Sequence, residues 1–372
     1  MATVWDKEVQ SFHGGQEHLT IDHLVCDFST TCSLQTPADA LAKAQEAVLS
    51  MHHYPAANFE PAISDLAEFL WGEDTATYKP LLLLGNGASE LIDLAIRLSS
   101  SNNPPSEQKW KPGPSMVQYK EYERSATVNG FITSHARDPD AKLMCMVNPT
   151  NPTGDFMSLE TIKSYLETTV SEGSVVLVDE SMQPWVGPHW REESLVSQRQ
   201  WCREMAIERN ISVFVIHSWT KLWSCPGIRL GSIISPTEAD CRNLKLRQVP
   251  WSVNCVALSF LSAVTKDTAY LEELWENTPI WNQQMREEIA SRFPDWRVQN
   301  DNTFLSWLWI ELPSEEIAEQ LTIVAREAKT PIRWGKPGYE LPTFVRLAVR
   351  PAHLSAILFD AIAAYLTSSS SS

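Results

Sequence analysis

Three polar residues that lie close together, Ser218, Lys221 and Arg229, could hold a phosphate group beside a reactive amine. They belong to the stretch HSWTKLWSCPGIRLG, in which glycines flank the arginine. A lysine amine forms a covalent imine with an aldehyde, while a hydroxyl and a guanidinium bind phosphate oxygens. The apolar and glycine-rich surroundings argue against the alternative, that the two cations are solvated surface charges. The stretch therefore predicts that Lys221 binds an aldehyde that carries a phosphate.

Two further turns carry polar or small residues directly after an apolar run. The stretch GNGASEL would leave backbone N–H groups of a helix N-terminus available to a phosphate, although it also fits an ordinary turn between a strand and a helix. The stretch VNPTNPTG contains Asn148 and Asn151, each before a proline. Asn151 could donate its amide N–H to an anionic ring oxygen, or both asparagines could stabilise the turn.

A third turn, in the stretch LVDES, ends an apolar run with Asp179. Burying a carboxylate is costly unless a partner compensates its charge. Asp179 therefore either pairs with a nearby cation for structural reasons or faces a protonated ring nitrogen.

Elements that could position these side chains alternate along the middle of the chain. Short apolar runs of strand type are separated by helical stretches, at 81–84, 142–147, 174–178, 211–216 and 231–235. This alternation predicts an α/β fold with a mostly parallel mixed sheet flanked by helices. Because ligands of such sheets lie at the carboxyl ends of the strands, we expect the polar turns to converge on one site.

Changes of pattern along the chain predict its domain organisation. After about residue 240 the sequence changes to long helical stretches and Trp-rich strands, which indicates a smaller α+β domain. Residues 100–115 are expected to form an exposed loop. The predicted parts are an N-terminal segment that packs with the small domain, a large domain, the small domain and a disordered serine tail, at 1–40, 41–240, 241–366 and 367–372 respectively.

Composition excludes several classes of function. The formal charge of −16 over 372 residues disfavours a nucleic-acid partner, and no run of about eighteen apolar residues predicts a membrane span. The seven cysteines are scattered and form no CxxC pair, so we expect reduced thiols and no metal site. Together with the charged N-terminal stretch, these features predict a cytoplasmic protein.

These motifs, taken in order, resemble those of the fold-type I pyridoxal-phosphate enzymes of the class I/II aminotransferase superfamily, over nearly the whole chain. The resemblance implies pyridoxal 5'-phosphate as the cofactor, with Lys221 as its Schiff-base lysine and Asp179 as the partner of its pyridine nitrogen. It implies that Asn151 donates to the ring O3' and that Tyr119 stacks on the ring as a further catalytic residue. It also implies a set of residues around the cofactor phosphate: Ala88, Ser89, Ser218 and Arg229.

The same resemblance implies a homodimer with shared active sites, because Tyr54 would reach the cofactor phosphate of the neighbouring subunit. One position departs from the family pattern. Met182 stands where a tyrosine or phenylalanine is usual, three residues after the aspartate. The ring O3' would then depend mainly on Asn151.

The two ends of the chain resemble threonine-phosphate decarboxylases most, and histidinol-phosphate aminotransferases next. The stretches FHGG and PIRWGKPGYELPTFVRLAVR carry this likeness. It implies that His13, Arg333 and Arg346 form the substrate site together with Asn151, and that Arg346 grips the substrate α-carboxylate. His13 could instead belong to a flexible N-terminus, and Arg333 could be a surface residue.

Three functions remain open at this point. If Arg346 holds the carboxylate in the plane of the ring, a C–H bond breaks and transamination of an α-amino acid follows. If the arginines hold a side-chain phosphate, the carboxylate can leave as CO₂. Transamination is the prediction that we place first, and decarboxylation of a phospho-amino acid is the alternative. A non-catalytic protein that binds pyridoxal phosphate is the third, which the joint presence of Lys221, Asp179 and Arg229 disfavours.

Overall fold

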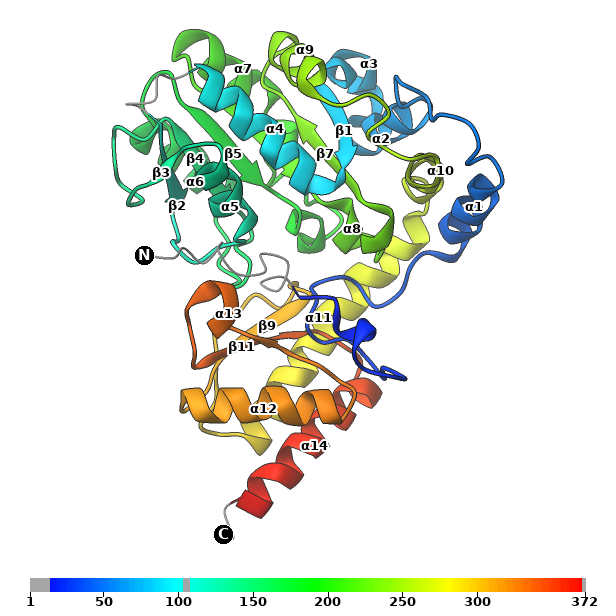
Figure 1. Cartoon of the computed structure of the whole chain (residues 1–372), viewed down its shortest axis with the longest axis vertical. Helices are drawn as coiled ribbons and strands as arrows, with labels where there is room; N and C mark the ends of the chain where they lie inside the picture. Colours follow the sequence, from blue (N-terminus) through cyan, green and yellow to red (C-terminus); the bar gives the residue numbers. More distant parts are fainter. Residues whose placement is uncertain (1–13, 103–107, 370–372) are drawn as a thin grey trace. The chain divides into compact units, whose positions relative to one another are not determined.

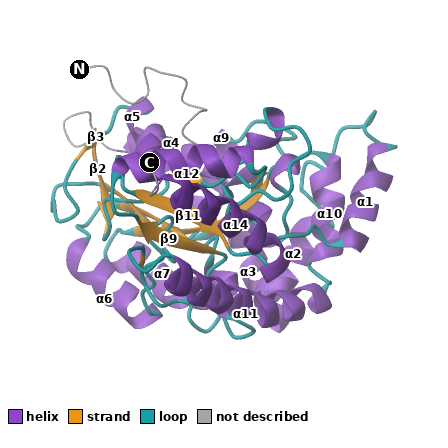
Figure 2. Cartoon of the chain, turned by 90° about the horizontal axis from the view of Figure 1, so that it is seen from below, coloured by secondary structure: helices purple, strands orange, loops and turns teal. Residues whose placement is uncertain are grey.

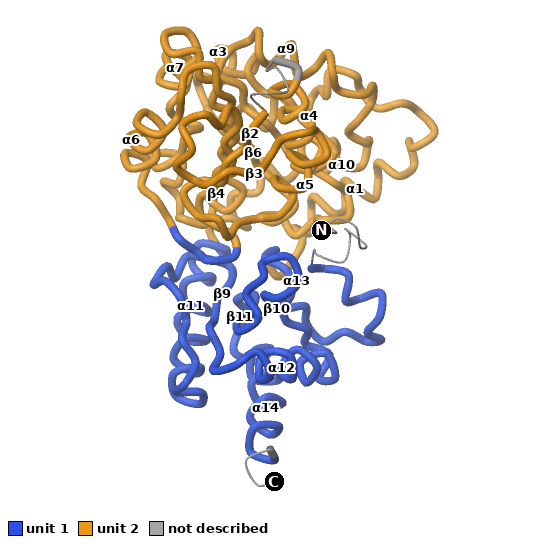
Figure 3. The backbone as a smooth tube through the Cα atoms, turned by 60° about the vertical axis from the view of Figure 1, so that its left-hand side comes forward, with its two compact units in different colours: residues 1–32, 152–155, 273–372 blue, residues 33–151, 156–272 orange. Residues whose placement is uncertain are grey.

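The chain, seen here as a computed structural model that describes residues 14–102 and 108–369, divides into two compact units (Figure 3). Unit 2 comprises residues 33–151 and 156–272, and unit 1 comprises residues 1–32, 152–155 and 273–372. The residues expected to bind the cofactor lie in unit 2, while both arginines expected to bind the substrate lie in unit 1. None of the described helices is long and apolar enough to cross a membrane.

Unit 2 is built on a seven-stranded mixed sheet with the strand order β1-β7-β6-β5-β4-β2-β3 (Figure 1). Strand β7 runs antiparallel to both of its neighbours, and the remaining pairs are parallel. The strands are β1 (Leu82–Asn86), β2 (Lys109–Gly113), β3 (Ile132–Thr133), β4 (Leu143–Val147), β5 (Val175–Asp179), β6 (Ser212–His217) and β7 (Leu230–Ile234). The predicted mostly parallel mixed sheet is confirmed.

The central strands are apolar because helices lie on both faces of the sheet (Figure 2). Every residue of β4 and β5 is buried. The helices of this unit are α1 (Ala38–Val48), α2 (Ala62–Trp71), α3 (Thr75–Tyr78), α4 (Gly87–Asn102), α5 (Glu121–Val128), α6 (Leu159–Thr169), α7 (Arg199–Glu208), α8 (Trp219–Leu222), α9 (Glu238–Arg247) and α10 (Cys255–Val264).

Strand β2 corrects the expectation of an exposed loop over residues 100–115. It pairs with β3 and β4, and four of its five residues are buried. The pattern is hard to recognise because the strand contains Lys111 and Pro112. The buried Lys111 ammonium donates to two backbone oxygens, of Asp138 at 2.8 Å and of Thr169 at 2.7 Å, which compensates its burial.

Unit 1 contains a four-stranded antiparallel sheet with the order β10-β11-β9-β8. Its strands are β8 (Arg297–Val298), β9 (Trp307–Glu311), β10 (Arg333–Trp334) and β11 (Phe344–Ala348). Its helices are α12 (Glu315–Glu327), α13 (Lys336–Tyr339), α14 (Ala352–Ser369) and most of α11 (Thr268–Arg292). The predicted smaller α+β part of the chain is thus present.

The division into units differs in position from the predicted domain boundaries. The sequence suggested a boundary near residue 240, whereas the chain passes from unit 2 to unit 1 at residue 272, within α11. Helix α10 belongs to unit 2 because it packs against α1 and α2. At the N-terminal side the change lies at residue 32, and residues 152–155 also belong to unit 1. The predicted serine tail at 367–372 partly overlaps α14, which extends to Ser369.

Candidate active site

Asp179 is the last residue of β5, and two hydrogen bonds fix its buried carboxylate. Its Oδ2 accepts a bond of 2.8 Å from the hydroxyl of Tyr122 on α5, and its Oδ1 accepts one of 2.8 Å from the backbone N–H of Ser181. Burial, together with the negative charge of Asp179, raises the pKa of Tyr122 well above its ordinary value. The hydroxyl therefore keeps its proton and remains a donor to the carboxylate.

A path of hydrogen bonds connects Asp179 with Lys221. The Oγ of Ser181, whose N–H binds Asp179, accepts a bond of 2.7 Å from the backbone N–H of Ser218. The Oγ of Ser218 in turn accepts a bond of 2.8 Å from the Nζ of Lys221. The carboxylate and the amine are thereby held by neighbouring residues at the ends of β5 and β6.

Lys221 lies on the short helix α8, whose backbone is held from several sides. The indole Nε1 of Trp219 donates to the Oγ of Ser232 on β7 at 2.9 Å. The backbone N–H of Ser33 donates to the carbonyl oxygen of Lys221 at 3.0 Å. The lysine is only half-buried, and its backbone is fixed.

Arg229 lies against the first turn of α4. A Cβ atom on Gly87, which has a φ of +76°, would come within 2.4 Å of the Nη2 of Arg229. A Cβ on Gly231 would come within 2.5 Å of the backbone nitrogen of Ala88. Gly231 thus permits the close approach of β7 to this turn, and Gly87 leaves room for the Arg229 guanidinium and adopts a φ that favours glycine. A guanidinium beside the N-terminus of a helix of 16 residues favours a bound phosphate, and Ala88 and Ser89 lie in that turn.

The two asparagines of the VNPTNPTG stretch differ in position. The amide of Asn148 donates to the carbonyl of Met157 at 3.0 Å and accepts from its N–H at 2.8 Å. The backbone N–H of Asn148 also donates to the carbonyl oxygen of Asp179 at 2.9 Å. Asn148 therefore stabilises the turn, as one of the two interpretations held. Asn151 is half-buried at the end of the same turn.

The two predicted tyrosines lie in different surroundings. Tyr119 is half-buried and makes an edge-to-face contact with Tyr122, with ring centroids 6.3 Å apart. It is thus one ring away from Asp179. Tyr54 is 78% exposed and stacks on Trp251 at 4.3 Å.

The two predicted substrate arginines are direct neighbours within unit 1. Arg333 on β10 pairs with Arg346 on β11 in the antiparallel register. Arg346 is buried and donates to the backbone oxygen of Ser29 at 2.6 Å. Burial lowers the pKa of Arg333 to about 10, and the charge of Arg346 acts in the same direction. The third predicted substrate residue, His13, lies outside the described residues.

Sequence reasoning missed Tyr122 and Ser181. Tyr122 follows Tyr119 by three residues on the same turn of chain, which is a weak signal, and only the fold brings it to Asp179. Ser181 stands in the quoted stretch LVDES but had no predicted role. Met182, noted as a departure, is a buried residue.

The sequence matches the aminotransferase class I and II family over residues 26–363. Histidinol-phosphate aminotransferase 1 of Dechloromonas aromatica is 23% identical over 288 residues, which cover 72% of this chain and 71% of that protein. Threonine-phosphate decarboxylase of Salmonella typhimurium is 26% identical over 155 residues, which cover 42% of this chain and 38% of that protein. A crystal structure of histidinol-phosphate aminotransferase from Sinorhizobium meliloti in complex with pyridoxal-5'-phosphate superimposes with a TM-score of 0.78 at 16% identity, covering 99% of this chain and 98% of that one.

Proposed function

The chain belongs to the aminotransferase class I and II family, and from that membership we propose that it is a pyridoxal-phosphate-dependent aminotransferase that acts on an α-amino acid. The observation that carries the proposal is the hydrogen-bonded path from Asp179 through Ser181 and Ser218 to Lys221. In it a carboxylate and an amine are held at fixed positions, as the proposed chemistry requires. A non-catalytic protein would need none of these groups.

The residues of unit 2 fit this cofactor. Arg229 and the first turn of α4 would hold its phosphate, together with Ser218, because the missing Cβ of Gly87 leaves room for the guanidinium at that turn. Asp179 would face the pyridine nitrogen, Asn151 the ring O3' and Tyr119 the ring. Lys221 would bind the aldehyde covalently.

The roles of the protein side chains follow from their chemistry. When bound, the cofactor supplies a protonated ring that accepts electrons from the substrate Cα. Asp179 would bind the protonated ring nitrogen, with its carboxylate held in place by the Tyr122 hydroxyl and the Ser181 N–H. The free amine of Lys221 would take a proton from the substrate Cα and return it at a different atom.

The arginine pair of unit 1 favours an anionic substrate. Like charges directly opposite each other on antiparallel strands repel, and an anion bound between them would offset this repulsion. Arg346 would hold the α-carboxylate, and Arg333 and His13 would take a second anionic group. For that reason decarboxylation of a phospho-amino acid remains the second candidate function.

To separate the two functions, the purified protein is assayed with a panel of amino acids and their phosphorylated counterparts. Transamination predicts formation of a keto acid, with the cofactor left in its amine form when no acceptor is added. Release of CO₂ from a phospho-amino acid, without conversion of the cofactor to its amine form, would contradict transamination and favour decarboxylation.

Variants of the arginines refine the same test. Arg346→Lys should reduce kcat/KM by about a hundredfold, since lysine cannot form two parallel bonds to a carboxylate. Arg333→Ala should weaken phospho-amino acids strongly and plain amino acids little if a second anionic group is bound. The exposed Arg297 on β8 offers a control, Arg297→Ala, which should change neither class.

We propose a homodimer with shared sites in the cytoplasm. The family resemblance implies that Tyr54 would hold the cofactor phosphate of a partner, and exposed apolar residues of unit 2 lie around it that a partner would bury. The exposed apolar residues there include Val48, Leu49, Met51, Leu246, Val249 and Trp251. All seven cysteines are free thiols, which fits a reducing compartment. A fully active monomer at nanomolar concentration would contradict the shared site.

A further inference from the structure

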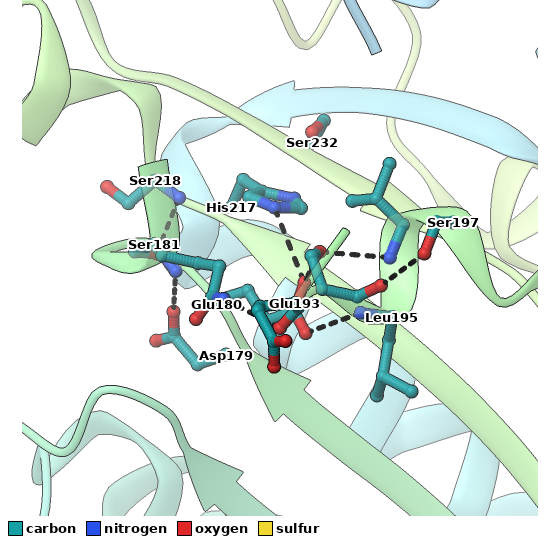
Figure 4. A network of polar contacts seen from close by, with 12 residues as sticks. Asp179, Glu180, Ser181, Glu193, Leu195, Ser197, His217, Ser218 and Ser232 are labelled. Atoms are coloured by element: carbon teal, nitrogen blue, oxygen red, sulfur yellow. Dashed lines mark hydrogen bonds and ion pairs between the residues drawn. The ribbon is translucent and has the colours of Figure 1, made fainter. Parts of the chain in front are cut away.

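Glu180 and His217, which the proposed reaction does not use, lie next to the proposed cofactor residues Asp179 and Ser218 (Figure 4). Glu180 follows Asp179 at the end of β5, and His217 precedes Ser218 at the end of β6. Both side chains are fully buried, and the Oε2 of Glu180 lies 4.0 Å from the Nε2 of His217. The backbone N–H of Glu180 donates to the carbonyl oxygen of Ile216 at 2.9 Å, which continues the pairing of the two strands.

The carboxyl group of Glu180 is anchored on its far side by the loop before α7. The Oγ of Ser194 donates to its Oε2, and the backbone N–H of Leu195 donates to its Oε1 at 2.9 Å. Ser194 also accepts the N–H of Val196 at 3.0 Å, so the loop is itself fixed. Glu180 therefore connects the end of β5 to a rigid loop.

His217 is held by aromatic rings and not by hydrogen bonds. Its ring stacks on that of Trp219, with centroids 4.7 Å apart and an interplanar angle of 5°, and it makes an edge-to-face contact with Trp190, with centroids 6.2 Å apart. Within the described part of the chain, neither ring nitrogen has a hydrogen-bond partner. A neutral Nε2 is thus available as an acceptor on the side that faces Glu180.

The titratable groups around the pair come from two elements: Asp179 on β5, and Arg199 and Cys202 on α7. Burial raises the pKa of Glu180 to about 7, although Ser194, Leu195 and Arg199 act in the opposite direction. Burial, followed by the charge of Arg199, lowers the pKa of His217 to about 3. Around neutral pH, His217 is therefore uncharged and Glu180 is the group that gains or loses a charge.

We propose that Glu180 and His217 are positioning residues, an inference that rests on the proposed function. They hold the neighbouring Asp179 and Ser218 in place, and the charge on Glu180 changes the electrostatic potential at the cofactor ring. An ionised Glu180 places a second negative charge next to Asp179 and raises the proton affinity of the bound cofactor. A protonated Glu180 removes that charge, and its proton can face the Nε2 of His217. The pair thereby couples solution pH to the cofactor site without touching the cofactor.

The test compares Glu180→Gln with wild type by titrating the absorbance of the bound cofactor with pH. The variant keeps the size and the acceptor oxygen of the side chain but has no charge at any pH. We expect the midpoint pH of the absorbance change to fall by about half a pH unit or more, because removing one nearby negative charge lowers the proton affinity of the bound cofactor. The control is Glu192→Gln, because Glu192 forms an exposed acid–imidazole pair with His189 in the same loop, and it should leave the titration unchanged.

A second readout does not involve the cofactor. Because the pKa of Glu180 is raised on folding, its contribution to the free energy of unfolding decreases as pH rises from its ordinary value of 4.5 through about 7. Thermal unfolding of the apo protein measures this dependence, and the decrease in stability with rising pH should be absent in Glu180→Gln. If Glu180→Gln is recovered unfolded, the variant His217→Gln provides the test instead. The amide of the new glutamine can donate to the Glu180 carboxylate, so the decrease in the free energy of unfolding should occur at lower pH.

Titration and unfolding curves of the folded variant that overlay those of wild type would overturn the positioning role. A wild-type protein that binds no pyridoxal phosphate would instead contradict the proposed function. The unfolding curves of the apo protein would still test the role of Glu180 and His217. The two failures are therefore distinguishable.

Discussion

At the scale of single residues, the proposed function gives the carboxylate of Asp179 a central role, and its hydrogen-bond partners fix its position. Tyr122 and Ser181 donate to its two oxygens, and Ser181 also binds the loop that carries Lys221. The types and spacing of Lys221, Asp179 and Arg229 were recognisable in the sequence because each lies near the end or the start of an apolar strand. Tyr122 was not, since a buried tyrosine on a helix looks the same in sequence whether it contacts a leucine or a carboxylate.

Replacing Tyr122 with phenylalanine tests the importance of this donor. Tyr122→Phe removes one hydrogen bond to a charged group, which contributes about 1.5 to 3 kcal/mol. We expect kcat/KM to fall by roughly ten- to a hundredfold, while the fold is retained because the ring still fills its site. Steady-state kinetics and circular dichroism check this, with Tyr78→Phe on α3 as the control. Unchanged kinetics in Tyr122→Phe would mean that Asp179 does not need the hydroxyl.

At the scale of elements, the sheet brings the carboxyl ends of β1, β5 and β6 together with the start of β7, and the apolar runs of the sequence predicted these strands. The runs predicted at 174–178 and 211–216 lie within one residue of β5 and β6. Strand β2 was missed because a lysine and a proline interrupt its apolar pattern. The end of unit 2 was missed because α10 is recognised as part of it only by its packing against α1 and α2.

The turn between β1 and α4 gives a prediction at this scale. In Gly87→Ala the new Cβ would clash with the guanidinium of Arg229, and a φ of +76° adds a strain of about 1 to 2 kcal/mol. We expect the affinity for pyridoxal phosphate to fall by about tenfold or more as the phosphate site is distorted.

Equilibrium dialysis of the apo protein against pyridoxal phosphate measures the affinity of each variant. Gly227→Ala is the matched control, because Gly227 lies near Arg229 in the chain and its added Cβ would meet no atom within 4 Å. Equal affinities of the two variants would contradict the placement of the phosphate at this turn.

For the whole molecule, burial of titratable groups connects the site with global stability. The pKa of His217 falls from its ordinary value of 6.5 to about 3 on folding, mainly through burial. The unfolded chain therefore binds a proton that the folded chain excludes, and the free energy of unfolding decreases as pH falls from about 6.5 to about 3. Nothing in the sequence alone distinguishes this histidine from an exposed one.

A series of thermal unfolding curves between neutral and acidic pH checks this expectation. His217→Phe should lose less stability on acidification than wild type does, because phenylalanine has no proton to gain. His189→Phe, at a position with 84% exposure of the side chain, should follow the wild-type curve. Identical acid sensitivity of His217→Phe and wild type would show that other groups dominate acid unfolding.

The central claim is that Lys221 binds pyridoxal phosphate covalently, and the most direct test is to find the modified lysine. The purified protein is incubated with pyridoxal phosphate, reduced with borohydride, digested and mapped by mass spectrometry. We expect the pyridoxyl phosphate label on the peptide that contains Ser218 and Lys221, and no specific label in Lys221→Ala. A stable label on a different lysine, or its persistence in that variant, would contradict the claim.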